Sequence, residues 1–162
     1  MRPLAFLFAF LLLATAAYAD PPPVNGVLWL RDLQLRFDAN RWDVNGAKNA
    51  YDIYCKTLDC AGVSIAVTIT STGDTCSPEA LRFDGPDVPG PGHVDRFSHA
   101  GLSFLVAEGN FDCVNLAGGP LRACTNYAGT TYLFNAPGQR CHTNPHASED
   151  FNGILQGLQP RQ

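Results

Sequence analysis

The stretch Val63-Ser-Ile-Ala-Val-Thr-Ile-Thr70 decides the fold class of this chain. A β-strand turns every second side chain to the same face, so an apolar residue at every other position is typical of a half-buried strand. Val63, Ile65, Val67 and Ile69 follow this alternation, and their β-branched side chains pack well on a pleated surface. We therefore predict a strand here, ended by the turn-forming residues 71–74.

Further strands are expected on both sides of this stretch. Leu33, Leu35 and Phe37 alternate with polar residues, and 51–55 is a shorter candidate. Residues 102–107 are apolar at consecutive positions, which predicts a strand buried on both faces. Residues 121–125 and 130–134 are predicted to form a hairpin that turns within 126–129. Turns are also expected at Asn45-Gly46 and in the Pro/Gly-rich segment 84–92.

Two helices are predicted. Ser77-Pro78-Glu79 is typical of the start of a short helix. At the C-terminal end, Ser148 is a candidate cap, and the next two acidic residues complement the helix dipole. The apolar stripe of this terminal helix comprises Phe151, Ile154, Leu155 and Leu158, and Pro160 is expected to end it. The predicted fold class is α+β, a largely antiparallel β-sheet with a C-terminal amphipathic helix, stabilised by disulfides.

The N-terminus has the pattern of a secretory leader. Arg2 precedes an apolar run from Leu4 to Leu13, and Ala17-Tyr18-Ala19 is the small-x-small motif of a cleavage site. We expect a signal peptide over 1–19, a proline-rich spacer over 20–26 and one α+β domain over 27–162. The expected location is secreted or periplasmic, and no stable membrane span is expected after cleavage.

The chain has six cysteines, all beyond the expected leader, and no Cys-x-x-Cys pair. An even count in an exported protein predicts up to three disulfides rather than a metal site. Six cysteines allow 15 pairings. Spacing weakly favours Cys55–Cys60 and Cys113–Cys124, which would leave Cys76 for Cys141.

Composition excludes one class of partner. The net charge is −4 and the basic residues are scattered singly, whereas nucleic-acid binding needs clustered Lys and Arg. No nucleic-acid partner and no cofactor are therefore expected, and the ligand or protein partner is unknown.

Three groups of residues suggest chemistry, and each has an ordinary alternative as a solvated loop. The first group, with nitrogen and oxygen ligands for a metal, is His142, His146, Glu149 and Asp150. The second, of the nucleophile, base and acid kind, is His93, Asp95, His99 and Ser103. The third, with oxygen ligands for calcium, is Asp84, Asp87 and Asp95. No catalytic or metal-binding residue is assigned. His142 and His146 have the i,i+4 spacing of a helical metal site, but Pro145 between them disfavours a helix. Ser103 has no Gly-x-Ser-x-Gly context, and the aspartates do not match the spacing of a calcium loop.

Aromatic residues are numerous enough to form a ligand-binding face, although core packing is the default for most of them. The candidates are Trp29, Trp42, Tyr51, Tyr54, Tyr127 and Tyr132.

The order of these features resembles that of PsbP/DcrB-like periplasmic and lumenal proteins. The resemblance rests on a strand ending in an aromatic residue, Arg41-Trp42, a series of strands, Gly129-Thr-Thr-Tyr-Leu-Phe134 and the Phe151-x-x-Ile-Leu155 helix. It covers most of the chain beyond the leader. It implies a sheet flanked by helices and an accessory or binding role rather than catalysis.

Together these features predict an exported, disulfide-stabilised, non-catalytic binding or accessory module. One alternative is a small secreted hydrolase that uses histidine and aspartate within 84–103. The other is a secreted inhibitor that presents the Pro/Gly loop as a rigid insert.

Overall fold

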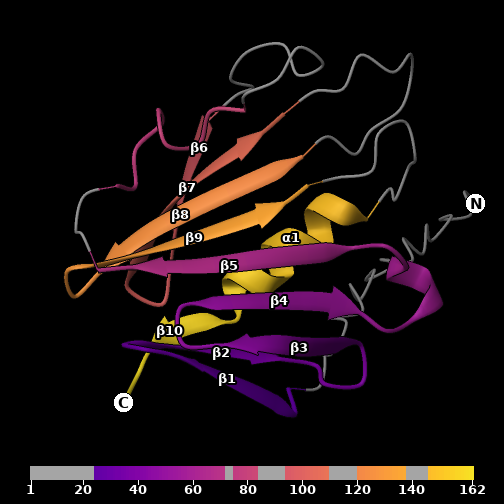
Figure 1. Cartoon of the computed structure of the whole chain (residues 1–162). Helices are drawn as coiled ribbons and strands as arrows, with labels where there is room; N and C mark the ends of the chain where they lie inside the picture. Colours follow the sequence, from indigo (N-terminus) through magenta and orange to yellow (C-terminus); the bar gives the residue numbers. More distant parts are fainter. Residues whose placement is uncertain (1–23, 72–74, 84–93, 110–119, 138–145) are drawn as a thin grey trace, which may run out of the picture.

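A computed structural model describes residues 24–71, 75–83, 94–109, 120–137 and 146–162 of the chain. These residues form two antiparallel sheets and one α-helix (Figure 1). The elements are β1 (Gly26–Leu30), β2 (Leu33–Phe37), β3 (Trp42–Ala47), β4 (Ala50–Cys55), the 3₁₀ helix η1 (Leu58–Cys60), β5 (Ser64–Thr70), β6 (Val94–His99), β7 (Leu102–Glu108), β8 (Leu121–Tyr127), β9 (Thr130–Ala136), α1 (Ala147–Gln156) and β10 (Leu158–Pro160).

The larger sheet has the strand order β3-β4-β5-β9-β8-β7-β6, and all of its neighbours are antiparallel. β5 is its third strand, and the predicted alternation is confirmed: Ile65, Val67 and Ile69 are buried. β5 pairs with β9, with Val67 opposite Phe134, and this is the pairing of the larger sheet that joins strands distant in sequence. β7 is buried on both faces, as predicted from its consecutive apolar residues. The predicted α+β class with a largely antiparallel sheet is therefore confirmed.

Turn chemistry is confirmed in one hairpin and corrected in another. The β8–β9 hairpin turns at Ala128 and Gly129, both of which have positive φ. The turn predicted at Asn45-Gly46 lies instead at residues 48–49. Gly46 remains inside β3 at a φ of 116°. A Cβ there would collide with the carbonyl of Ala50, so this glycine permits close strand approach rather than the reversal.

The smaller sheet has the order β1-β2-β10, which brings the two ends of the described chain together. Leu158 lies opposite Leu35 in this sheet, so it belongs to a strand and not, as predicted, to the helical stripe. Pro160 likewise lies within β10. The reason is local: the backbone of Gly157 contacts the carbonyl of Arg36 so closely that a Cβ would not fit, and the chain leaves the helix there to pair with β2.

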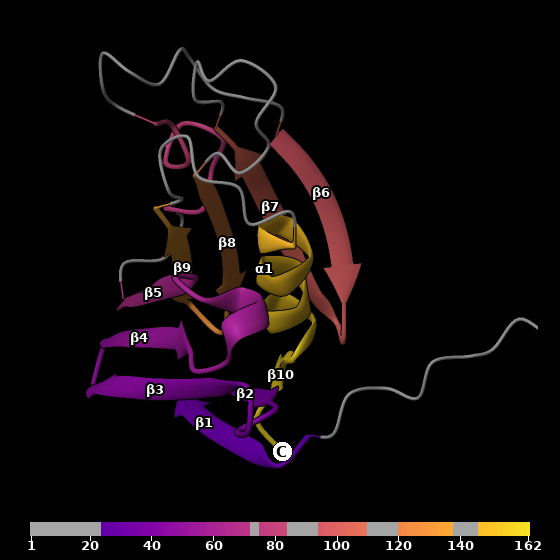
Figure 2. The same cartoon turned by 90° about the vertical axis from the view of Figure 1, so that its right-hand side faces the viewer.

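The helix α1 packs on the inner face of the larger sheet, which curves around it (Figure 2). Phe151 and Leu155 are fully buried and share one core with Ile65, Val67 and Phe134. Three residues of the predicted stripe, Phe151, Ile154 and Leu155, are thus buried in the core that includes β5. The predicted cap is displaced, because α1 begins at Ala147 with His146 as its N-cap residue.

Residues 77–82 form successive hydrogen-bonded turns rather than the predicted short helix. They place Leu81 and Phe83 in a second apolar cluster with Leu105, on the other face of the larger sheet. Cys76 is bonded to Cys124 of β8 and fixes this segment to the sheet.

Two disulfides are present in the described residues, Cys55–Cys60 and Cys76–Cys124. The first confirms the favoured short loop. The second corrects the other pairings that spacing favoured, because Cys124 is bonded across the sheet to Cys76 and not to Cys113. Cys113 and Cys141 lie outside the described residues.

Candidate functional site

The outer face of the smaller sheet exposes apolar side chains. In each of its strands alternate residues point inward, where Leu30, Leu33 and Leu35 are fully buried. The residues between these inward positions point outward, and among them Val27 and Trp29 of β1 are 49% and 50% exposed. Strand register and alternation assign five side chains to this outer face: Val27, Trp29, Gln34, Arg36 and Gln159. Arg161, the residue after β10, joins them as a sixth through its contact with Trp29. A half-exposed tryptophan on a folded strand is the feature that most needs an explanation.

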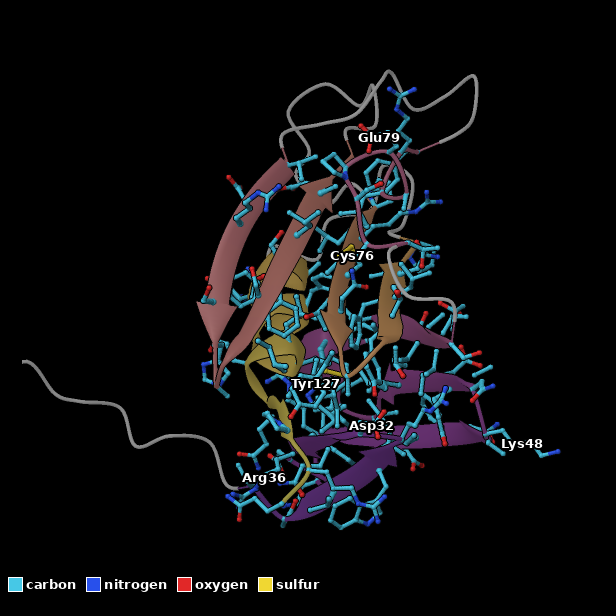
Figure 3. The ribbon with its side chains drawn as sticks, turned by 90° about the vertical axis from the view of Figure 1, so that its left-hand side faces the viewer. Asp32, Arg36, Lys48, Cys76, Glu79 and Tyr127 are labelled. Atoms are coloured by element: carbon cyan, nitrogen blue, oxygen red, sulfur yellow. A yellow bond between two sulfur atoms is a disulfide. The ribbon has the colours of Figure 1, made fainter. Side chains whose placement is uncertain are left out.

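Arginines flank the exposed tryptophan. The guanidinium carbon of Arg161 lies 4.7 Å from the ring centroid of Trp29, which is a cation–π contact. The same guanidinium donates to the carbonyl of Arg31 at 3.3 Å, so its plane is held at two points. Arg36 lies opposite Val27 across the strand pair and is exposed. Figure 3 shows Arg36 at one end of the molecule, on the smaller sheet, with Glu79 near the other end.

A cavity of about 430 Å³ adjoins the first turns of α1. Phe37, Trp42 and Ile154 supply apolar walls, and Arg41 and Asp150 supply charged ones. Gly153 also lines the cavity, and a Cβ added to it would have no neighbouring atom within 4 Å. The cavity is therefore partly apolar and ends at an ion pair.

That ion pair joins three separate elements. Arg41 donates from Nη2 to Oδ1 of Asp150 at 2.6 Å, and its Nη1 lies 2.6 Å from Oδ2 of Asp59 in η1. The Asp150 side chain is only 10% exposed, and its Oδ2 is buried with no hydrogen-bond partner in the described residues. Arg41 thereby ties the loop closed by Cys55–Cys60 to the start of α1.

The two carboxyl groups on Arg41 shift in opposite directions. Burial raises the pKa of Asp150 above its usual value, although Arg41 acts against this. The hydrogen bond from Thr57 lowers the pKa of Asp59, with a further contribution from Arg41. The two pKa shifts differ in direction because the Asp150 carboxyl is buried, whereas the Asp59 carboxyl is exposed.

The proposed metal ligands do not converge in the described residues. His146 Nδ1 lies 3.0 Å from Glu149 Oε2, but Asp150 is directed to Arg41. His142 lies outside the described residues. Nowhere in the described ranges do three or more metal-ligating side chains gather.

The proposed catalytic residues are separated by strand geometry. Ser103 lies opposite Ser98, and His99 lies opposite Leu102, so Ser103 and His99 project from opposite faces of the sheet. Asp95 and His99 are four residues apart on β6, or about 13 Å along a strand. His93 of the catalytic group lies outside the described residues. Asp84 and Asp87 of the calcium group lie outside them as well, so the structure does not test the calcium hypothesis.

The aromatic candidates divide by environment. Trp42 and Tyr132 are core residues at 5% and 0% exposure, and the Tyr132 hydroxyl accepts from the backbone N–H of Asp32. Tyr51 and Tyr127 are half-buried, and Tyr54 donates to Asp43 on the surface. Trp29 is the aromatic candidate on the outer face of the smaller sheet.

Comparison with known proteins shows similarity in fold alone. Neither a protein-family model nor a curated protein sequence matches the chain. The solution structure of cyanobacterial PsbP (CyanoP) from Synechocystis sp. PCC 6803 matches with a TM-score of 0.52 and 10% identity, covering 80% of this chain and 87% of that one.

The fold is PsbP-like. The resemblance expected from the order of sequence features is thus confirmed as a resemblance of fold. In the described part of this PsbP-like chain, no helix is long and apolar enough to cross a membrane.

Proposed function

We propose that this chain is an exported, disulfide-stabilised binding or accessory module without catalytic activity, and that it contacts its partner through the outer face of the smaller sheet. The observation that carries the proposal is that Trp29 and Val27 are half exposed on a strand whose Leu30 is fully buried. Binding surfaces are enriched in tryptophan and arginine, and Arg161 is stacked on this tryptophan.

Two further observations support the proposal. The expected leader over 1–19 and the two disulfides fit an oxidising compartment outside the cytoplasm. The PsbP-like fold fits the accessory role that the family resemblance implies. The hydrolase alternative has no such support, because Ser103 and His99 project from opposite faces of their sheet.

Site-specific photocrosslinking in the producing cell tests the proposal. A photoreactive phenylalanine analogue is placed at Trp29, and a matched control carries it at Leu58, which is 96% exposed on η1. We expect one discrete crosslinked partner from position 29 in the exported fraction and none from position 58. Equal or absent crosslinking at the two positions would contradict the proposal. Labelling of the purified protein by a fluorophosphonate probe would favour the hydrolase instead.

A further inference from the structure

The edge of the smaller sheet is open along β1. β1 is the outer strand in the order β1-β2-β10, and its backbone hydrogen bonds within the described residues go to β2 only. An open edge carries unpaired N–H and C=O groups, which an extended segment of another chain can pair with. The side chains of such a segment would then lie next to Val27 and Trp29.

The charge of this face is opposite to that of the whole chain. The chain has a net charge of −4, yet none of the six outward side chains is acidic and two of them are arginines. In the part of the chain that the structure describes, no carboxylate lies within ion-pair distance of Arg36 or Arg161.

The nearest acidic residues in sequence make no ion pair with these arginines. Asp32, before β2, lies 3.9 Å from Arg31 instead, and Asp38, after β2, accepts a hydrogen bond from the backbone of Asn40. The two arginines therefore present positive charge next to exposed apolar surface, a combination that fits carboxylates carried on an extended chain.

We propose that β1 binds an acidic, extended segment of a partner protein as an added strand. The backbone of the segment would pair with the open edge of β1, its apolar side chains would contact Val27 and Trp29, and its carboxylates would contact Arg36 and Arg161. The guanidinium of Arg161 is already held by Trp29 and the carbonyl of Arg31, so little side-chain entropy is lost when it binds. This inference rests on the proposed function and names the partner's chemistry.

Synthetic peptides test the inference on the intact, disulfide-bonded protein. The probe is a labelled heptapeptide, Glu-Thr-Val-Thr-Glu-Thr-Glu, whose first, third, fifth and seventh side chains share one face of a strand. Its counterpart has Lys for every Glu. Anisotropy should show saturable binding of the Glu peptide only. We expect R36Q/R161Q and W29A each to weaken binding about tenfold. R96Q, which changes an exposed arginine on β6, should leave it unchanged.

Strand addition is tested separately from charge. Two Glu peptides are N-methylated at every second residue, one along each edge, so that each peptide cannot donate from its methylated edge. The peptide blocked along the pairing edge should lose binding about tenfold or more, and the other should keep it. Undiminished affinity of both peptides would overturn strand addition. Equal binding of the Lys peptide, or tighter binding of phosphatidylglycerol vesicles or oligothymidylate, would overturn the acidic protein segment. A photocrosslinked partner whose contact segment is basic would overturn this inference while the proposed function stands.

Discussion

Arg41 and Asp150 are 109 positions apart in the sequence and are joined by a 2.6 Å hydrogen bond between Nη2 and Oδ1. The contact connects the loop after β2 to the first turn of α1. Because the Asp150 side chain is only 10% exposed, its charge is stabilised mainly by Arg41.

Removal of Arg41 should therefore destabilise the protein. In R41A the Asp150 carboxylate is left buried without its counter-ion, and the expected loss is about 3 kcal/mol of unfolding free energy. Urea unfolding at neutral pH measures it. The double variant R41A/D150A should recover part of the loss, and R96A, on an exposed arginine, serves as control. If R41A and R96A have equal stability, the ion pair contributes nothing.

The opposite pKa shifts on Arg41 predict opposite pH dependences. A raised pKa at Asp150 contributes stability below the unfolded value of 3.8, and this is lost as pH rises through the folded pKa. D150N should therefore gain stability relative to wild type as pH rises above about 4. The lowered pKa of Asp59 contributes stability above 3.8 that is lost as pH falls through the folded pKa. D59N should thus differ most from wild type above about pH 4, and Tm against pH for the three proteins checks both signs.

Two glycines near the end of α1 should respond oppositely to alanine. Gly153 lies inside the helix, and a Cβ there meets open space, so G153A should stabilise by about 0.5–1 kcal/mol. Gly157 contacts the Arg36 carbonyl, so G157A should disturb the pairing of β10 with β2 and destabilise. Thermal unfolding distinguishes the two variants. A gain in G157A would mean that the backbone contact is easily relieved.

Truncation of the helix core should be costly. Leu155 is fully buried in the main core, so L155A should lose about 2–5 kcal/mol of unfolding free energy. L58A, at an exposed leucine, is the matched control and should be near neutral. An unchanged Tm for L155A would show that α1 is not held by this stripe.

The cysteine count predicts a third disulfide. Four cysteines are paired in the described residues, which leaves Cys113 and Cys141 for each other if no thiol is free. Alkylation of the denatured, unreduced protein should label nothing, and a non-reducing digest should contain a peptide pair joined through Cys113 and Cys141. Labelling of both residues would leave the protein with two disulfides.

The elements that could be predicted from the sequence are those whose apolar residues repeat with one clear period, either that of a strand or that of a helix. β5 alternates without exception, and the stripe Phe151, Ile154 and Leu155 fits a helix. Leu158 fits helical spacing as well as it fits a strand, and only the contact of Gly157 with β2 decides between them. β6 has polar residues on both faces and so gives no periodic signal.

The candidate face could not be predicted for a similar reason. The run Gly-Val-Leu-Trp-Leu of β1 is apolar at consecutive positions, which indicates burial on both faces. In the structure β1 is an edge strand that pairs with β2, and its outer face stays uncovered, with Val27 and Trp29 about half exposed. One signal of an exposed face is present. Trp29 lies on the face opposite to Leu28 and Leu30, and its cross-strand neighbour on that face, Gln34, is polar.

The order of strands has a consequence for how the chain would fold during the export that we propose. One edge of β5 pairs with β9, and one edge of β2 pairs with β10, and both partners lie far along the chain. Strand pairings this distant in sequence form slowly, because the entropy of closing a long loop is lost before the stabilising contacts form. A chain that emerges from a translocation channel with its N-terminus first would therefore leave one edge of β5 unpaired until β9 is released, and one edge of β2 unpaired until β10 is released. Its folding time, and its need for a chaperone in the receiving compartment, would be set by the C-terminal end.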